Sequence, residues 1–252
     1  MVKGLDVFRE HFRGYADQYV LIGGAACDLA MDEVGVDFRV TKDLDIVLCV
    51  EALDKAFVRA FWDFVRSGGY QLQETATGEK RFYRFQKPTN QDYPFMLELF
   101  SREPDLLSPV EGSQLTPIPV DEDVSSLSAI LLDDDYYRFL RSGTKEKDGL
   151  PFVGPEHLIP LKARAWMDLA KRKEQGDQVD SKDIKKHRND VFRLYGIIDP
   201  RFEAEIPEKI SQDMDAFITR MATETIDLKS LGLRNVRQEE ALENLRRIYC
   251  RD

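Results

Sequence analysis

Two aspartates placed two residues apart at the start of an apolar run are the residues of this chain best suited to chemistry. Asp43 and Asp45 directly precede the apolar run 46–50. Residues i and i+2 of a β-strand point to the same face of a sheet, so we expect both carboxylates on one side. Mg²⁺ prefers carboxylate and phosphate oxygens as ligands. The pair therefore indicates a site that holds Mg²⁺ against a nucleoside triphosphate, and the alternative is a solvated turn at a polar strand start.

A third carboxylate is a candidate for the same site. Glu98 is the lone charge inside the apolar run 95–100. Burial of an unpaired carboxylate is costly, and a metal ion would remove that cost. We expect Glu98 on a strand beside the aspartates, where it completes a two-ion Mg²⁺ site or serves as a general base. The alternative is an edge-strand residue that faces water.

A pair of glycines precedes the acidic pair. Gly23 and Gly24 follow the apolar run 19–22 and open a helical segment. A backbone without side chains can approach a triphosphate closely, and the N-terminus of a helix binds anionic oxygens. A Gly-Gly pair after a strand is often only a tight turn. The phosphate-binding interpretation therefore depends on the two aspartates that follow.

The C-terminal half contributes one lysine and one aspartate of interest. Lys162 lies on or beside the apolar stripe of a predicted helix, where a lysine either extends to solvent or meets an anion such as a triphosphate. Asp190 borders the apolar side of the next helix, where it could orient Lys162 or bind the sugar or base of a nucleotide. The alternative is a weak pair with Lys186 of its own helix.

These residues are expected in an α+β protein, with a mixed sheet and flanking helices over 1–150 and a helical domain over 151–252. The following strands are predicted from apolar runs and turn residues: 19–22, 43–50, 70–74, 81–86 and 95–100, with further strand structure at 115–120 and 127–132. The following helices are predicted: 5–15, 24–31, 52–65, 133–140, 155–174, 181–196, 207–224 and 236–249. A loose polar segment over 144–149 precedes the boundary, and Ser181 is the expected N-cap of its helix.

The spacing of these motifs resembles a known superfamily. Residues 21–25 (Leu-Ile-Gly-Gly-Ala) and 39–46 (Arg-Val-Thr-Lys-Asp-Leu-Asp-Ile) resemble the signature of polymerase-β-like nucleotidyltransferases. The Arg-x-Thr lead-in and the long gap are most similar to the AbiEii/AbiGii branch, the toxins of type IV toxin–antitoxin systems. Residues 161–165 and 186–191 resemble the downstream motif of that branch, which pairs a helix lysine with an aspartate on the next helix.

The resemblance implies a two-lobed transferase that uses Mg²⁺ and a nucleoside triphosphate. The roles that it implies are metal binding by Asp43, Asp45 and Glu98, nucleotide binding by Gly23, Gly24, Lys42 and Lys162, and catalysis by Asp43, Asp45, Glu98, Lys162 and Asp190. Some characterised members act on tRNA 3′ ends, so tRNA or another acceptor and a small antitoxin protein are expected partners. The chain departs from the pattern at Ala25, where many relatives have Ser or Thr, and at Lys186-His187, where many have Arg-Asp.

The composition indicates the cellular compartment in which the protein is expected. None of the apolar runs in the 252 residues approaches the roughly 20 residues that span a bilayer. The first residues lack the apolar core of a secretory signal. Three cysteines and three histidines are scattered without the spacing of metal ligands, which is typical of a reducing cytosol and argues against a zinc centre. We therefore expect a cytoplasmic protein that makes no contact with a membrane.

The net charge leaves other functions open. A charge of −10 argues against nonspecific coating of nucleic acid. It suits a small cationic acceptor, as in the antibiotic-modifying relatives of the same superfamily, or a basic protein partner. A catalytically silent nucleotide-binding or interaction module is the alternative from a different class.

Overall fold

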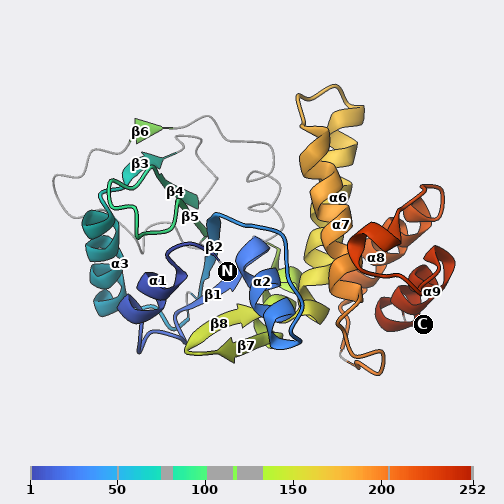
Figure 1. Cartoon of the computed structure of the whole chain (residues 1–252), viewed down its shortest axis with the longest axis horizontal. Helices are drawn as coiled ribbons and strands as arrows, with labels where there is room; N and C mark the ends of the chain where they lie inside the picture. The colour runs from blue at the N-terminus through green and yellow to red at the C-terminus, as the bar shows by residue number, and fades with distance from the viewer. Residues whose placement is uncertain are drawn as a thin grey trace. The chain divides into compact units, whose positions relative to one another are not determined.

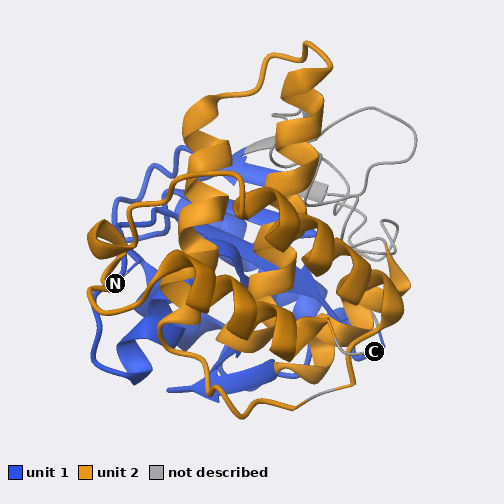
Figure 2. Ribbon diagram, turned by 90° about the vertical axis from the view of Figure 1, so that its right-hand side faces the viewer, with its two compact units in different colours: residues 1–120, 144–153 blue, residues 121–143, 154–252 orange. Residues whose placement is uncertain are grey.

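The computed structural model describes residues 2–49, 51–74, 82–100, 116–117, 133–203 and 205–250. The chain divides into two compact units, which Figure 2 shows in different colours. Unit 1 comprises residues 1–120 and 144–153, and unit 2 comprises residues 121–143 and 154–252. Unit 1 is built on a mixed β-sheet with helices and unit 2 is helical, so the predicted α+β class is confirmed.

The sheet of unit 1 is formed by strands from both ends of its sequence. Its strands are β1 (Tyr19–Ile22), β2 (Asp43–Leu48), β3 (Gln71–Glu74), β4 (Phe82–Gln86), β5 (Met96–Phe100), β6 (Thr116–Pro117), β7 (Thr144–Lys147) and β8 (Leu150–Val153). They follow the order β6-β3-β4-β5-β2-β1-β8-β7 (Figure 1). Strand β2 pairs parallel with β5 and antiparallel with β1. The central position of β1 and β2 explains their apolar residues, because a central strand is covered on both faces.

The hairpin of β7 and β8 corrects one prediction. Residues 144–149 were expected to be a loose segment, and this expectation is wrong. The two strands pair antiparallel around Asp148 and Gly149, whose φ angles are 52° and 80°. Positive φ at both central residues is the geometry of a two-residue hairpin turn, for which Asp-Gly is a preferred sequence. Strand β8 then adds to the sheet beside β1, with Phe152 opposite Leu21.

Helix α3 (Lys55–Gly68) is defined by signals at both of its ends. The carboxylate of Asp54 accepts hydrogen bonds from the backbone N–H groups of Ala56 and Phe57, and Gly69 ends the helix in the left-handed conformation at φ 62°. The helix therefore starts later than predicted. Its aromatic side chains pack with Phe8 of α1 (Leu5–His11), with Phe12 directly after α1 and with Tyr19 of β1. The predicted strand at 127–132 and most of that at 115–120 lie outside the described residues.

Unit 2 contains the four helices predicted for the C-terminal part, together with the helix predicted at 133–140 and a short 3₁₀ helix that was not predicted. They are α5 (Asp134–Ser142), α6 (Pro155–Glu174), α7 (Ser181–Tyr195), α8 (Glu208–Met221), the short 3₁₀ helix η2 (Leu228–Leu231) and α9 (Gln238–Tyr249). Helix α6 continues through Pro160 and packs against α7. The N-cap of α7 is Asp180 and not Ser181, because the Asp180 carboxylate accepts a hydrogen bond from the N–H of Lys182.

The start of α2 (Gly23–Glu33) is the element of unit 1 that matters most for the site. The helix begins at the residue that follows β1, so its first N–H groups lie at the end of a central strand.

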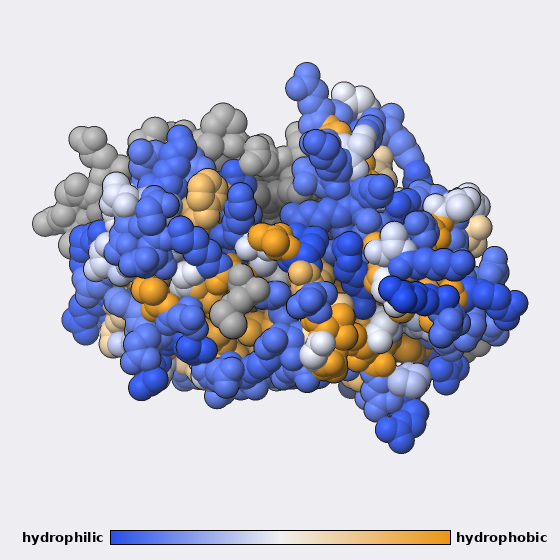
Figure 3. All heavy atoms as spheres, viewed as in Figure 1, coloured by the Kyte–Doolittle hydropathy of each residue, from blue (hydrophilic) through white to orange (hydrophobic). Residues whose placement is uncertain are grey.

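On the molecular face that Figure 3 shows, hydrophilic residues prevail and apolar residues form smaller patches. No helix within the described ranges has the length and apolar character needed to cross a membrane.

Candidate active site

The register of the sheet places three carboxylates on one face of unit 1. Glu98 of β5 is the direct partner of Asp45 on the parallel neighbour β2, and Asp43 lies two residues before Asp45. Directly paired residues and residues two apart share a face. Leu44 and Ile46, the neighbours of Asp45 in the chain, are buried and point to the opposite face. The alternation of acidic and apolar residues in β2 therefore turns both aspartates to the side where Glu98 lies.

The glycine that follows β1 makes room for one of these carboxylates. Gly23 has φ 63°, and a Cβ atom at this position would lie 1.6 Å from Oδ2 of Asp45. Gly24 lies similarly close to Thr41, because a Cβ atom at Gly24 would lie 2.5 Å from Oγ1 of Thr41. The glycines therefore do more than form a turn, because Gly23 occupies a position that no other residue could take without displacing the Asp45 carboxylate.

The N-terminus of helix α2 adds a positive electrostatic potential beside the acidic face. Its first N–H groups have no partner within the helix, and they carry the partial positive charge of the helix N-terminus. Gly23, the first residue of α2, is in close contact with Asp45, so this helix end lies beside the acidic face. An anion placed here would meet N–H groups from the helix and, through a bound cation, the carboxylates.

Glu98 has a partner that the sequence did not suggest. Arg84 of β4 lies directly opposite Glu98, and its Nε and Nη2 atoms lie 2.8 Å and 2.6 Å from Oε1 of the glutamate. Both side chains are 9% exposed. The sequence suggested a metal ion as the partner of the Glu98 charge, and the structure adds Arg84 as a partner from the protein itself. The edge-strand alternative is wrong, because β5 lies between β4 and β2.

Glu98 is also close to the carboxylate of Asp45. Burial and the neighbouring negative charge of Asp45 raise the pKa of the Glu98 carboxyl well above its ordinary value, and Arg84 acts in the opposite direction. Asp45 and Glu98 are directly opposite each other on neighbouring strands. Asp45 and Glu98 thus form a tightly coupled acidic pair, which is the environment that a divalent cation stabilises.

The donor set fits Mg²⁺ in the way this ion is usually held. Among the residues that the structure describes, no group of three or more Asp, Glu, His or Cys side chains is assembled as a complete metal-binding cluster. Mg²⁺ usually takes one or two protein carboxylates and completes its shell with water and substrate phosphates. Asp43 and Asp45 on one strand face match that requirement, whereas Oε1 of Glu98 is bound by Arg84. The role of Glu98 as a metal ligand stays a prediction.

The remaining candidate residues lie apart from this group in the sequence. In unit 2, Nζ of Lys162 lies 3.5 Å from Oδ2 of Asp190, and Nη1 of Arg193 lies 3.4 Å from the other oxygen of that carboxylate. Lys162 is 4% exposed and Asp190 is fully buried. Asp190 is thus bound by a lysine from α6 and an arginine from its own helix. The predicted catalytic roles of Lys162 and Asp190 stay predictions, as does nucleotide binding by Lys42, an exposed residue just before β2.

Comparisons with known proteins assign neither a family nor an activity. No protein-family model matches the chain, and no curated protein matches it. Among solved structures, the chain is similar to the crystal structure of an antigenic nucleotidyltransferase-like protein from Paracoccidioides brasiliensis, with 15% sequence identity and a TM-score of 0.46. The match covers 97% of this chain and 92% of that one. A likeness at this level indicates neither a shared family nor a shared activity.

Proposed function

We propose that this protein is a Mg²⁺-dependent nucleotidyltransferase. In this reaction an acceptor hydroxyl attacks the α-phosphorus of a nucleoside triphosphate, the nucleoside monophosphate is transferred, and pyrophosphate leaves. One observation carries the proposal: Asp43, Asp45 and Glu98 share one face of neighbouring strands, beside the helix that begins at Gly23. Nucleotidyl transfer depends on charge neutralisation and in-line positioning. The three carboxylates and the start of α2 are groups that could supply both.

Each residue of this candidate site has a role in the proposed reaction. Asp43 and Asp45 would hold Mg²⁺, which when bound supplies the positive charge that phosphoryl oxygens need. The N–H groups at the start of α2 would receive phosphate oxygens. Glu98, whose pKa is raised by burial and by Asp45, is suited to take the proton of the attacking hydroxyl. Arg84 holds the Glu98 carboxylate in place.

We extend the proposal to the acceptor and partners on the basis of the sequence resemblance. An AbiEii-like toxin in the cytoplasm would use tRNA as acceptor and would be neutralised by a small antitoxin protein. In that enzyme Lys162, oriented by Asp190, would neutralise the leaving group, and Lys42 would contribute to nucleotide binding. The net charge of −10 favours a second candidate, a transferase that acts on a small cationic molecule.

Binding and transfer assays test the proposal directly. ATP, CTP, GTP and UTP are titrated by calorimetry with and without Mg²⁺, and each α-labelled nucleotide is then incubated with total tRNA or with aminated small molecules. We expect Mg²⁺-dependent binding of at least one nucleotide and label in the acceptor. Mg²⁺ with that nucleotide should also raise the unfolding temperature, and EDTA should reverse the rise. Tight binding without transfer to any acceptor would instead favour a silent nucleotide-binding module, and no Mg²⁺-dependent binding would refute the site.

Replacement of Gly23 by alanine tests the close approach to Asp45. The methyl group would collide with the Asp45 carboxylate and require a strained left-handed backbone. We expect a loss of about 1–3 kcal/mol in stability, and a displaced carboxylate should lower transfer roughly 10²-fold. Unfolding and steady-state transfer rates measure the two effects.

Gly35→Ala is the matched control for this experiment. Gly35 has a similar φ of 69°, but nothing lies within 4 Å of the position that its Cβ would take. We therefore expect the control to lose stability through backbone strain and to keep its transfer rate. Equal rates in the Gly23 and Gly35 variants would show that the contact with Asp45 has no catalytic importance.

A further inference from the structure

A cavity of about 710 Å³ lies within unit 2, in residues that the proposed transferase reaction does not use. It is lined by residues of α5, α6, the segment before α8 and the first turn of α8, among them Phe139, His157, Phe202 and Glu205. A volume of this size is in the range of small-molecule sites. The cavity is therefore large enough to take a ligand of its own.

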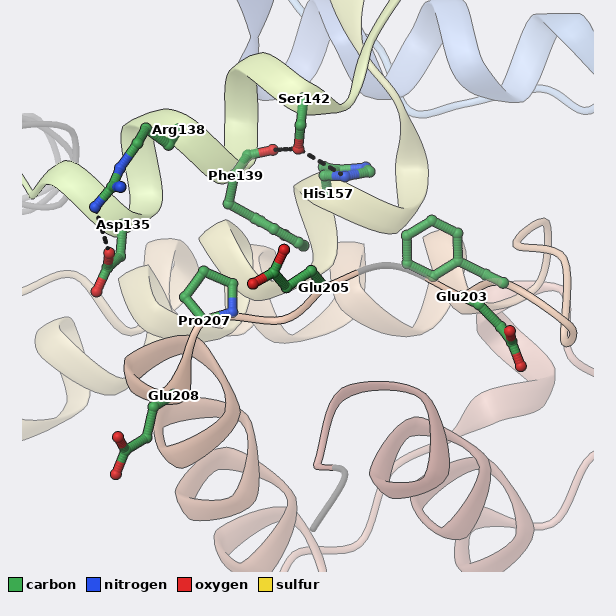
Figure 4. Close-up of a pocket in the computed structure, with 10 residues that line it drawn as sticks. Asp135, Arg138, Phe139, Ser142, His157, Glu203, Glu205, Pro207 and Glu208 are labelled. Carbon is green, nitrogen blue, oxygen red and sulfur yellow. Dashed lines mark hydrogen bonds and ion pairs between the residues drawn. The ribbon is translucent and has the colours of Figure 1, made fainter.

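Aromatic rings form one wall of the cavity. The His157 ring packs on Phe139 with centroids 4.4 Å apart and meets Phe202 edge-on at 5.5 Å. A Cβ atom at Gly143 would lie 2.0 Å from Cγ of His157, so the ring rests directly on the backbone where α5 ends. Ser142 lies 3.5 Å from Nε2 of the same ring (Figure 4). These contacts fix the wall in place before any ligand binds.

The charged residues of the cavity are mostly acidic. Its lining includes four carboxylates and one guanidinium, that of Arg138, which is bound to Asp135 at 2.9 Å. In Figure 4 the Glu205 carboxylate lies between Phe139 and Pro207, whereas those of Glu203 and Glu208 point away at the two ends. The field in the cavity therefore repels phosphates and other anions and attracts cations.

We propose that this cavity binds a small organic cation, an alkylammonium of the aliphatic polyamine class. An ammonium group near Glu205 would form a charge-assisted hydrogen bond, and a methylene chain would lie along the rings of Phe139 and Phe202. An inorganic cation has no apolar chain to place along the aromatic wall, and an apolar ligand has no charge to place near the carboxylates. The combination of the two surfaces selects a ligand that has both an apolar chain and positive charge.

Equilibrium dialysis of the full chain with labelled spermidine, at about 0.15 M salt to screen weak surface attraction, tests the proposal. We expect saturable binding that Glu205→Gln weakens roughly tenfold and Phe202→Leu weakens roughly threefold. Glu243→Gln, which removes the same charge from an exposed position of α9, is the matched control and should leave the affinity unchanged.

Two outcomes would overturn the assignment. Equal affinity in the Glu205→Gln and Glu243→Gln variants, or binding without saturation, would mean that spermidine only gathers at an acidic surface. Displacement of spermidine by a tetralysine peptide at far lower concentration than by spermidine itself would assign the cavity to lysines of a protein partner. The assay contains no nucleotide or Mg²⁺ and every lining residue belongs to unit 2, so its result does not depend on the transferase proposal.

Discussion

Asp45→Asn is expected to lower nucleotide transfer by at least about 10³-fold, equivalent to about 4 kcal/mol of transition-state stabilisation, while the chain stays folded. Asparagine has the shape of aspartate and fits beside Gly23, but it lacks the charge that holds Mg²⁺. Asp45 is also the member of the acidic face that lies against Gly23 and directly opposite Glu98. Its loss should therefore remove the metal site and its coupling to Glu98 together. The measurement is kcat/KM at saturating Mg²⁺.

Stability measurements separate a catalytic effect from misfolding. The negative charge of Asp45 contributes to the raised pKa of Glu98, so the two carboxyls repel each other when both are ionised. Without Mg²⁺, the Asp45→Asn variant should be as stable as the parent chain or more stable by about 1 kcal/mol, an increase of roughly 2–4 °C in unfolding temperature. The parent chain alone should be stabilised when Mg²⁺ and nucleotide are added.

Asp63→Asn is the control that makes the same chemical change on the surface of unit 1. Asp63 pairs with Arg66 on α3, and both side chains are 58% exposed. Such a pair contributes little to stability, so neither stability nor transfer should change measurably. If Asp45→Asn retains turnover similar to that of this control, the assignment of the acidic face as an active site is wrong.

The sequence alone was enough to predict that the two aspartates share a face, because this depends only on their spacing within one strand. Alternation of acidic and apolar residues in 43–48 determines which side chains share a face, whatever the neighbouring strands are. The position of Glu98 beside Asp45 depends instead on long-range pairing, because β5 pairs with β2 although β3 and β4 lie between them in sequence. The sequence indicated only that a lone charge in an apolar strand needs a partner.

Arg84 was missed although the same reasoning applies to it. It is the lone charge in the strand Phe82–Gln86, as Glu98 is in Met96–Phe100. Two lone charges of opposite sign on two predicted strands are candidates for a cross-strand pair. What the sequence could not supply was the register, because the pairing of β4 with β5 is set by the turn and by the packing of both strands.

The hairpin β7–β8 was missed for another reason. Its first strand, Thr144–Lys147, is polar and mostly exposed, and its charged residues suggest a solvated loop. Charged residues are, however, common on the outer strand of a sheet, where they discourage pairing with other molecules. The turn residues Asp148 and Gly149 were the local signal that could have identified the hairpin.

Arg84→Met is expected to destabilise unit 1 by about 3–5 kcal/mol near pH 8, because it leaves the buried Glu98 beside Asp45 without its cation. Fluorescence of Trp62, which contacts Phe85 on the same strand as Arg84, reports the unfolding of this unit. The measurement uses a Trp166→Phe background, since Trp166 belongs to unit 2 and is the other tryptophan of the chain. Arg66→Met on the exposed surface of α3 should cost less than about 1 kcal/mol.

The pH dependence of this loss has a definite sign. Burial and Asp45 already raise the pKa of Glu98 in the folded chain, and removal of Arg84 eliminates the opposing influence. A carboxyl whose pKa is raised by folding contributes stability below its unfolded pKa and loses that contribution as the pH rises through the folded value. Arg84→Met should therefore be least harmful near pH 4 and increasingly harmful towards pH 8, where Glu98 has to be ionised or take up a proton at a cost.

The double variant Arg84→Met/Glu98→Leu decides between a lost ion pair and lost packing. If the cost of Arg84→Met comes from an uncompensated carboxylate, replacement of Glu98 by an apolar residue should restore most of the stability and remove its pH dependence. If the cost comes from the missing arginine chain, the double variant should be no more stable than the single one. Restored stability without restored transfer would show that the reaction needs the Glu98 carboxylate, whereas the stability of the sheet does not need the ion pair.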